Sequence, residues 1–158
     1  MTDPQATRQL ATTDSGPVSG LIDGEIVRFM GIPYAAPPKR FELPQQPVAW
    51  QTVRLADDPG PAAPQRVNPF PALDATVLVG TGSDGGDGDY LRLNVWAPVN
   101  ACQAPVMVFI HGGGFIAGHK DVSVSDGTAF ARSGVLCVAI NYRMGIDGFL
   151  PVPGAPTN

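Results

Sequence analysis

The sequence has few cysteines, few charges and no long hydrophobic run, and each shortage excludes a class of protein. Two cysteines, Cys102 and Cys137, are too few for a disulfide framework or a zinc site, so both are expected to be thiols. Ten Lys and Arg residues stand singly against 14 acidic residues, a net charge of −4 without a basic stripe, which argues against nucleic-acid binding. No run approaches the roughly 20 apolar residues of a membrane helix, and the amino end has no signal-peptide core. A cytoplasmic location away from membranes is expected.

The composition predicts one loop-rich globular domain. Hydrophobic residues make up 44% of the chain and charged residues 15%, which allows a sizeable core. Nineteen glycines and 17 prolines indicate many turns and irregular connections. Residues 1–16 are polar and without periodicity, so they are predicted to be a disordered tail before a domain over residues 17–158.

Residues 106–118 carry the strongest functional signal in the chain. The five apolar residues 106–110 are typical of a strand that is buried on both faces in a parallel sheet. Gly112, Gly113 and Gly114 follow at the carboxyl end of that strand, where open α/β sheets bind ligands. Backbone without side chains can turn several N–H groups toward one point, which makes an anion site. A glycine turn without chemistry is the alternative.

The segment after the glycines predicts a βαβ unit. A short helix is expected between the N-cap candidate Asp126 and the capping glycine Gly134. The apolar run at 135–140 then predicts a second buried strand, parallel to 106–110 through a right-handed crossover. The exit of this strand, residues 141–143, is expected at the same sheet edge as the glycines.

Two strand patterns precede this unit. Residues 91–97 alternate, and they are predicted to pair antiparallel with the strand at 106–110. Residues 18–32 indicate two strands joined by a type I′ turn at Asp23-Gly24.

Five other side chains have a functional and a structural interpretation each. Tyr34 and Phe41 lie in an extended proline-rich segment and either line a pocket or fasten that segment to the core. Arg143 is more often an ion-pair partner than a catalytic group. His111 as a base and His119 as a metal ligand both lack a visible nucleophile or second ligand, so structural roles are favoured.

The segment at residues 80–85 matches the G-x-G-x-x-G dinucleotide fingerprint and follows a strand-like run at 76–79. No helix pattern comes after it and no acidic residue stands about twenty positions further on, so the fingerprint lacks its context. Asp84, Asp87 and Asp89 suggest a calcium loop, but the distal glutamate of an EF-hand is missing. A flexible surface loop is the better interpretation, and neither a cofactor nor a metal is expected.

Six motifs follow one another along the chain, at residues 29–38, 40–41, 59–61, 89–98, 111–115 and 141–145. In this order they closely resemble the type-B carboxylesterases, the family that includes cholinesterases and p-nitrobenzyl esterases. The resemblance implies an α/β-hydrolase fold, with a mostly parallel central sheet and an antiparallel N-terminal part. It also implies cleavage of a small-molecule carboxylic ester through a serine acyl-enzyme. By the same resemblance, the backbone N–H groups of Gly113 and Gly114 are oxyanion donors.

The chain departs from the family in two ways. Gly88 and Tyr90 stand where the family has an acidic residue and a cysteine, so the usual ion pair of Arg40 and an N-terminal disulfide are not expected. No G-x-S-x-G occurs in the 158 residues, so the catalytic triad is absent from this chain, which is expected to be an N-terminal fragment that ends before the nucleophile elbow. A non-catalytic, cholinesterase-like interaction module is the alternative function. The oligomeric state is not encoded.

Overall fold

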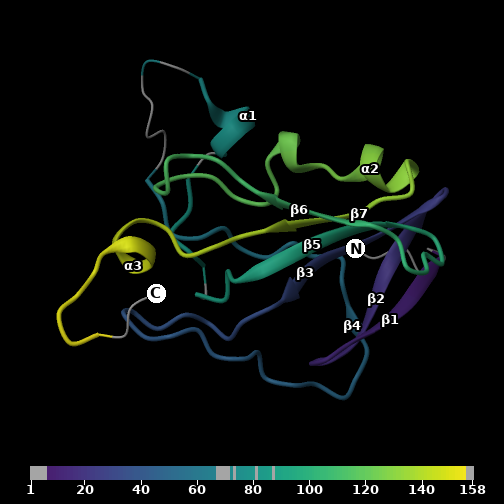
Figure 1. Ribbon diagram of the computed structural model, residues 1–158, viewed down its shortest axis with the longest axis horizontal. Coiled ribbons are helices and arrows are strands. Elements are labelled where there is room, and N and C mark those ends of the chain that lie inside the picture. Colours follow the sequence, from purple (N-terminus) through teal and green to yellow (C-terminus); the bar gives the residue numbers. More distant parts are fainter. Residues whose placement is uncertain (1–6, 67–71, 73, 81, 87, 156–158) are drawn as a thin grey trace.

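The computed structural model describes residues 7–66, 72, 74–80, 82–86 and 88–155, and within them seven strands form one mixed sheet (Figure 1). The strands are β1 (Arg8–Thr13), β2 (Gly16–Asp23), β3 (Ile26–Pro33), β4 (Arg54–Leu55), β5 (Arg92–Pro98), β6 (Val106–Ile110) and β7 (Leu136–Ile140). The helices are α1 (Thr76–Val79), α2 (Thr128–Arg132) and α3 (Gly145–Phe149), with a 3₁₀ turn at Ser123–Ser125. The strand order is β1-β2-β3-β5-β7-β6, and β4 pairs with β2. None of the described helices is long and apolar enough to cross a membrane.

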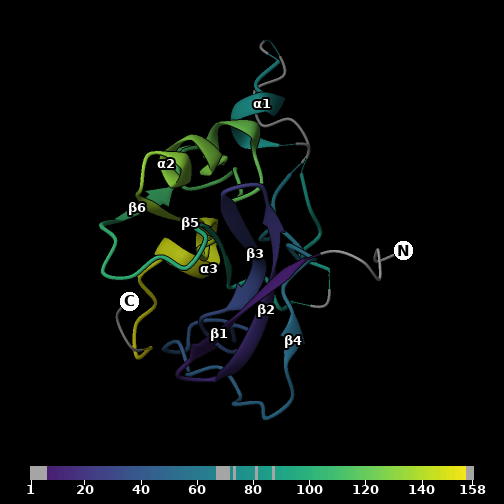
Figure 2. The ribbon, with the colours of Figure 1, turned by 90° about the vertical axis from the view of Figure 1, so that its right-hand side faces the viewer.

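The amino end of the chain is part of the sheet. The predicted tail over residues 1–16 is wrong for residues 8–13, which form β1 and pair with β2 along their whole length (Figure 2). Residues 1–6 lie outside the described residues. An edge strand is held by backbone hydrogen bonds and needs no apolar pattern, so its polar sequence concealed it. Arg8 strengthens the attachment, because its guanidinium donates to Oδ1 of Asp57 (3.0 Å).

The predicted hairpin between β2 and β3 is confirmed, but its turn differs by one residue. Asp23 is the last residue of β2 and pairs with Ile26, so the two central turn residues are Gly24 and Glu25. Only Gly24 of these two has a positive φ (+63°). A type I′ turn needs a positive φ at both positions, so that expectation is wrong.

The βαβ prediction is confirmed, whereas one predicted strand pairing is wrong. β6 and β7 are parallel and in register from Val106 opposite Leu136 to Ile110 opposite Ile140. β5 does not pair with β6, because β7 lies between them and pairs antiparallel with β5. The chain order alone does not say on which side of β6 the returning strand is inserted.

Helix α2 covers the sheet at close range (Figure 1). Its N-cap is Gly127 rather than the expected Asp126, which stands one residue earlier and accepts the N–H of Thr128 at Oδ1 (2.7 Å). An added Cβ at Gly127 would lie 2.6 Å from Cβ of Cys137, so only glycine permits this approach. Gly134 follows the helix with a φ of +85°, as a C-terminal glycine cap requires.

The two faces of the sheet are covered by different segments. Under α2 the buried cluster consists of Ile26, Trp96, Ala131, Cys137 and Ala139. The other cluster includes Trp50 and also Ala56, whose backbone follows β4 and is hydrogen-bonded to Ser19 of β2 and to Met30 of β3. That second cluster consists of Val18, Val27, Phe29, Trp50, Ala56 and Ala97.

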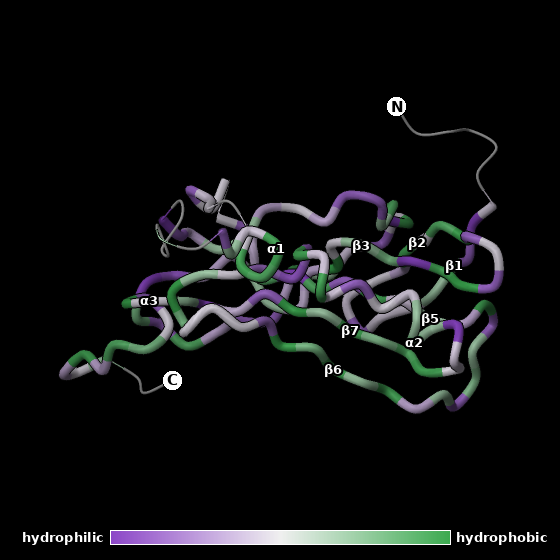
Figure 3. The backbone as a smooth tube through the Cα atoms, turned by 90° about the horizontal axis from the view of Figure 1, so that it is seen from above, coloured by the Kyte–Doolittle hydropathy of each residue, from purple (hydrophilic) through white to green (hydrophobic). Residues whose placement is uncertain are grey.

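The strand β6 is exposed on one face, contrary to the prediction that it is buried on both. Val106, Val108 and Ile110 are 62%, 53% and 63% exposed, and they are called the β6 strip below. In the view from above, β6 runs as a largely hydrophobic trace along the margin of the molecule (Figure 3). The strand is at the edge of the sheet, so its outer backbone groups have no neighbouring strand among the described residues.

Two short helices were not foreseen by the sequence pattern. The strand-like run at 76–79 forms α1, and that expectation is wrong. Residues 145–149 form α3, whose first residue, Gly145, has a φ of +57°. Helices of four or five residues are too short to show a helical period, so tertiary contacts decide them.

The exposed β6 strip generates a prediction about association. We expect the 158-residue chain to self-associate and to bind the dye ANS, because a flat apolar edge strand pairs with other chains. Val108→Lys should shift light scattering toward the monomer and lower the ANS fluorescence at least severalfold. Val48→Lys is the control, since Val48 is 79% exposed but lies outside the sheet. A wild-type chain that is monomeric and free of ANS binding would contradict the expectation.

Candidate functional site

The parallel pairing of β6 and β7 brings two loops to one edge of the sheet, beside α1 and α3 (Figure 1). The first, residues 111–118, is called the glycine loop below. Tyr142, just after β7, donates its hydroxyl to the backbone oxygen of His111 (3.0 Å) and stacks on the imidazole with ring centroids 4.4 Å apart. The N–H of Gly145 donates to the oxygen of Phe115 (2.7 Å). The predicted meeting of the two strand exits is confirmed.

The backbone of the glycine loop has a shape that a side chain at Gly113 would prevent. Gly113 has a φ of +119°, and an added Cβ there would lie 1.9 Å from the oxygen of Ala117. The oxygen of Gly113 accepts the N–H groups of Ile116 and Ala117, both at 3.2 Å. Gly114 also has a positive φ (+62°), but an added Cβ would meet open space. Close approach of backbone to backbone therefore requires glycine at 113.

The N–H groups of Gly113 and Gly114 donate to no acceptor within the described part of the chain. They border a hollow of about 400 Å³ whose other walls are apolar. The lining residues are Ala75, Leu78, Val79, Gly112, Gly113, Gly114 and Val124. Adjacent backbone donors without acceptors, next to an apolar space, are suited to an anionic oxygen on an otherwise apolar molecule.

A glutamine side chain fastens the end of the glycine loop. Gln65 donates from Nε2 to the oxygen of Gly118 (3.0 Å) and accepts the N–H of the same residue at Oε1 (2.8 Å). This pair of bonds imitates the pairing of two strands. Gln65 was missed by sequence reasoning, and a single glutamine in an irregular segment gives no signal from which it could be found.

His111 is buried beneath the loop rather than presented to solvent. Its side chain is 3% exposed, and Nδ1 lies 2.9 Å from the oxygen of Gly112. Burial is the main cause that lowers the pKa of the imidazole below its ordinary value. Nε2 is inaccessible to solvent and has no hydrogen-bond partner among the described residues. The favoured structural role agrees with this geometry, because neither ring nitrogen can reach a substrate.

A buried lysine follows the loop and holds its end in place. Lys120 is fully buried, and its ammonium donates to Oδ2 of Asp121 (2.7 Å). Asn94 donates to Oδ1 of the same carboxylate (2.6 Å), and Oδ1 of Asn141 accepts the N–H of Lys120 (2.8 Å). Sequence reasoning missed this network because its members are far apart along the chain.

The network changes the pKa values of both charged partners. Burial lowers the pKa of Lys120, and the charge of Asp121 only partly opposes this change. Burial by itself raises the pKa of Asp121. The hydrogen bonds that its carboxylate accepts and the charge of Lys120 together lower the pKa by more, so the net pKa is below its ordinary value. Each partner therefore keeps the other ionised.

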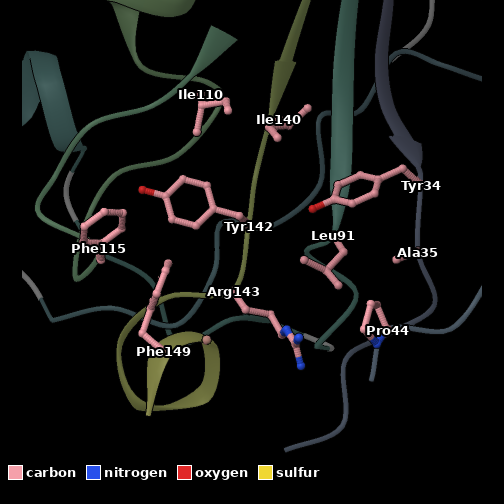
Figure 4. A pocket seen from close by; sticks show the side chains of 11 residues that line it. Tyr34, Ala35, Pro44, Leu91, Ile110, Phe115, Ile140, Tyr142, Arg143 and Phe149 are labelled. Carbon is pink, nitrogen blue, oxygen red and sulfur yellow. The ribbon is translucent and has the colours of Figure 1, made fainter. Parts of the chain in front are cut away.

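A second hollow, of about 400 Å³, lies at the exits of β6 and β7 (Figure 4). Phe115, Tyr142 and Phe149 form one aromatic wall, with Phe115 and Phe149 centroids 4.7 Å apart. Tyr34 forms part of the opposite wall and donates to the oxygen of Asn141 (2.5 Å). Burial raises the pKa of Tyr34 to about 12. Tyr34 thus both lines a pocket and fastens its segment, whereas Phe41 is not among the lining residues.

The remaining predicted residues take structural positions. Arg143 donates to the oxygen of Glu42 (2.8 Å) at the rim of the second hollow. Arg40 pairs with Asp147 (Nε to Oδ1, 2.5 Å) rather than with a residue near position 88. His119 lies against Gly80, where an added Cβ would be 2.2 Å from Nε2.

Among the described residues, which exclude Asp87, no group of metal-binding side chains occurs. The cysteines Cys102 and Cys137 are free thiols, as predicted.

Comparison with known proteins gives consistent matches over nearly the whole chain. The carboxylesterase family model matches residues 7–156. Fumonisin B1 esterase of Sphingopyxis macrogoltabida is 38% identical over 96% of this chain and 27% of its own length. Para-nitrobenzyl esterase of Bacillus subtilis is 38% identical over 91% of this chain and 29% of its own length. The chain thus spans less than a third of the length of each of these two relatives.

Solved structures confirm the predicted fold class. A p-nitrobenzyl esterase structure superposes with a TM-score of 0.80 at 34% identity, over 92% of this chain and 30% of the other. Such neighbours have the α/β-hydrolase fold, of which this chain forms a part. Within the described residues the sheet is mostly antiparallel, because only β6 with β7 and β2 with β4 run parallel.

The buried pair of Lys120 and Asp121 generates a prediction about stability. Asp121→Asn should lower the free energy of unfolding by about 3 kcal/mol near pH 7, because it leaves a buried ammonium without its counter-charge. The matched control is Lys120→Met combined with Asp121→Asn, which should regain most of this loss. Urea unfolding measures both variants.

The same experiment at acid pH tests the charge of Asp121. The folded-state pKa is below the unfolded value of about 3.9, so the stabilisation is present above the unfolded pKa and is lost as pH falls through the folded pKa. The Asp121→Asn variant should lack this part of the acid dependence. Equal pH dependence in wild type and variant would contradict the role of the pair.

Proposed function

Because the chain belongs to the carboxylesterase family, we propose that the protein hydrolyses carboxylic esters and that this chain supplies its oxyanion-hole loop. The observation that carries the proposal is the pair of N–H groups at Gly113 and Gly114, which have no acceptor among the described residues. Ester cleavage creates a negative oxygen in the tetrahedral intermediate, and backbone donors fixed in advance stabilise that charge without reorganising. The position of the loop directly after the parallel strand β6 agrees with this role.

The proposed reaction passes through a serine acyl-enzyme. A serine hydroxyl attacks the ester carbonyl, its proton passes to a histidine, and the alcohol leaves with that proton; water then releases the acid by the same route. The G-x-S-x-G motif is absent from these 158 residues, so we assign the serine, the acidic residue and the histidine to further polypeptide. The threefold greater length of the relatives supports this assignment.

The hollow beside the glycine loop favours an ester with an apolar group. Its walls include Leu78, Val79 and Val124, and none of its described lining residues is charged. We propose that this space takes the acyl or alcohol portion of a small-molecule ester while the carbonyl oxygen points at the glycine N–H groups. A charged group there would lose its hydration without gaining a partner.

The proposal predicts a specific loss of turnover in the complete protein. Gly113→Ala should force the loop away from Ala117 and misplace a donor, because the added Cβ has no room. Loss of one oxyanion donor lowers kcat by about 10²–10³ and changes KM little. Steady-state kinetics on a short-chain p-nitrophenyl ester measure both constants.

Gly134→Ala is the matched control for this variant. It adds the same methyl group at a positive φ (+85°) in open space, so it should destabilise by about 1 kcal/mol and leave kcat nearly unchanged. Thermal melting shows whether each variant is folded. A folded Gly113→Ala variant with wild-type kcat would show that the glycine loop is a turn without a catalytic role.

A second prediction concerns the 158-residue chain alone. It should not hydrolyse p-nitrophenyl acetate faster than a peptide control that contains the same number of histidines, since it has no nucleophile elbow. Saturable hydrolysis that a serine-directed inhibitor blocks would refute the assignment of the triad to further polypeptide. A complete, folded protein without any esterase activity would favour the interaction module instead.

A further inference from the structure

We propose that His111 is a positioning residue: its Nδ1–H donates to the oxygen of Gly112 and thereby fixes the direction of the N–H of Gly113. This inference rests on the proposed function, because it concerns how the oxyanion donor is held. The distance from Nδ1 to the Gly112 oxygen is 2.9 Å.

The peptide bond between Gly112 and Gly113 links the hydrogen bond of His111 to the N–H of Gly113. The oxygen of Gly112 and the N–H of Gly113 belong to one planar trans peptide unit and point in opposite directions. A donor that holds the oxygen on one side therefore holds the N–H on the other. Glycine on both sides of this unit leaves it few local constraints, so an external hydrogen bond has a large effect on its orientation.

The imidazole itself is held rigidly enough for this task. It is 3% exposed and stacks on the ring of Tyr142, with an angle of 16° between the planes. The hydroxyl of Tyr142 donates to the backbone oxygen of His111, which holds the same residue at a second point. The ring thus has little freedom to turn away from Gly112.

The chemistry of the pair determines which ring nitrogen carries the proton. A carbonyl oxygen can only accept, so Nδ1 must carry the hydrogen. Burial lowers the pKa of His111, which favours the neutral ring at pH 7. Nε2 is then an unprotonated nitrogen without a partner among the described residues. The side chain is placed to donate once, to the backbone, and not to exchange protons with a substrate.

Gly118 packs directly against the hydrogen bond between His111 and Gly112, and this contact is independent evidence for the role of that bond. Its φ is +110°, and an added Cβ would lie 2.3 Å from Nδ1 of His111 and 2.4 Å from the oxygen of Gly112. The returning end of the glycine loop therefore covers both atoms of this hydrogen bond and shields it from water. Gln65 holds Gly118 in that place through its two hydrogen bonds.

The test compares His111→Asn with His111→Leu in the complete protein. The two side chains have the same branched shape and both remove the ring stack, but only Asn carries an amide donor, the same number of bonds from Cα as Nδ1. We expect kcat of the Leu variant to be about 10-fold to 100-fold below that of the Asn variant, with similar KM values, because the oxyanion donor is misdirected. His119→Leu, which alters the other histidine, should change kcat little.

A spectroscopic measurement tests the hydrogen bond without activity. The ¹³C resonance of the Gly112 carbonyl should move in the Leu variant and return toward the wild-type position in the Asn variant. The ring ¹⁵N resonances of wild-type His111 should show a protonated Nδ1 and an unprotonated Nε2. This measurement uses the wild-type protein, so it does not depend on the folding of a variant.

The outcomes separate this inference from the proposed function. Equal kcat values for folded Asn and Leu variants, an unmoved Gly112 carbonyl resonance or a proton on Nε2 alone would each overturn the role of His111. If the complete wild-type protein hydrolyses no ester, the proposed function fails, and the two NMR measurements still decide whether His111 orients this peptide.

Discussion

The arrangement of the candidate site depends on the parallel pairing of β6 with β7. Parallel strands end at the same edge of a sheet, so the glycine loop and the residues after β7 meet although about thirty positions separate them. Tyr142 then contacts His111 by a hydrogen bond and by ring stacking. An antiparallel partner in the place of β7 would put these groups at opposite ends of the strands.

Rigidity of the glycine loop comes from polar groups that are themselves buried. Gln65 binds Gly118 through both backbone groups, and the carboxamide of Asn141 accepts the N–H of Lys120 immediately beyond the loop. The ammonium of Lys120 is in turn neutralised by Asp121. Buried polar groups have large desolvation penalties unless all of them are paired, so such a network permits few alternative conformations. A donor site that acts by electrostatics needs this kind of fixed backbone.

Both the β6 strip and the N–H groups of Gly113 and Gly114 lack a partner among the described residues. A strand of apolar residues in a parallel sheet is ordinarily covered on both faces and paired on both edges. Here the face formed by Val106, Val108 and Ile110 is exposed, and β6 is paired on one edge alone among the described strands. The chain also spans less than a third of the length of fumonisin B1 esterase. Under the proposed function, the glycine loop forms one wall of the catalytic centre, and among the described residues nothing pairs with the outer edge of β6 or with the loop's N–H donors.

The sequence by itself determined the fold class, the β2–β3 hairpin, the βαβ unit and the position of the glycine loop, because apolar runs, turn residues and glycines act over a few neighbouring positions. It was wrong about residues 8–13, 76–79 and the partner of β5, where local pattern is weak and pairing is chosen by contacts elsewhere in the chain. Only the tertiary structure decided that Gln65 and Lys120 support the loop and that His111 turns its Nδ1 toward Gly112. The physical reason is that hydrogen bonds to backbone atoms depend on where distant segments are brought together, and no residue type or spacing records that position.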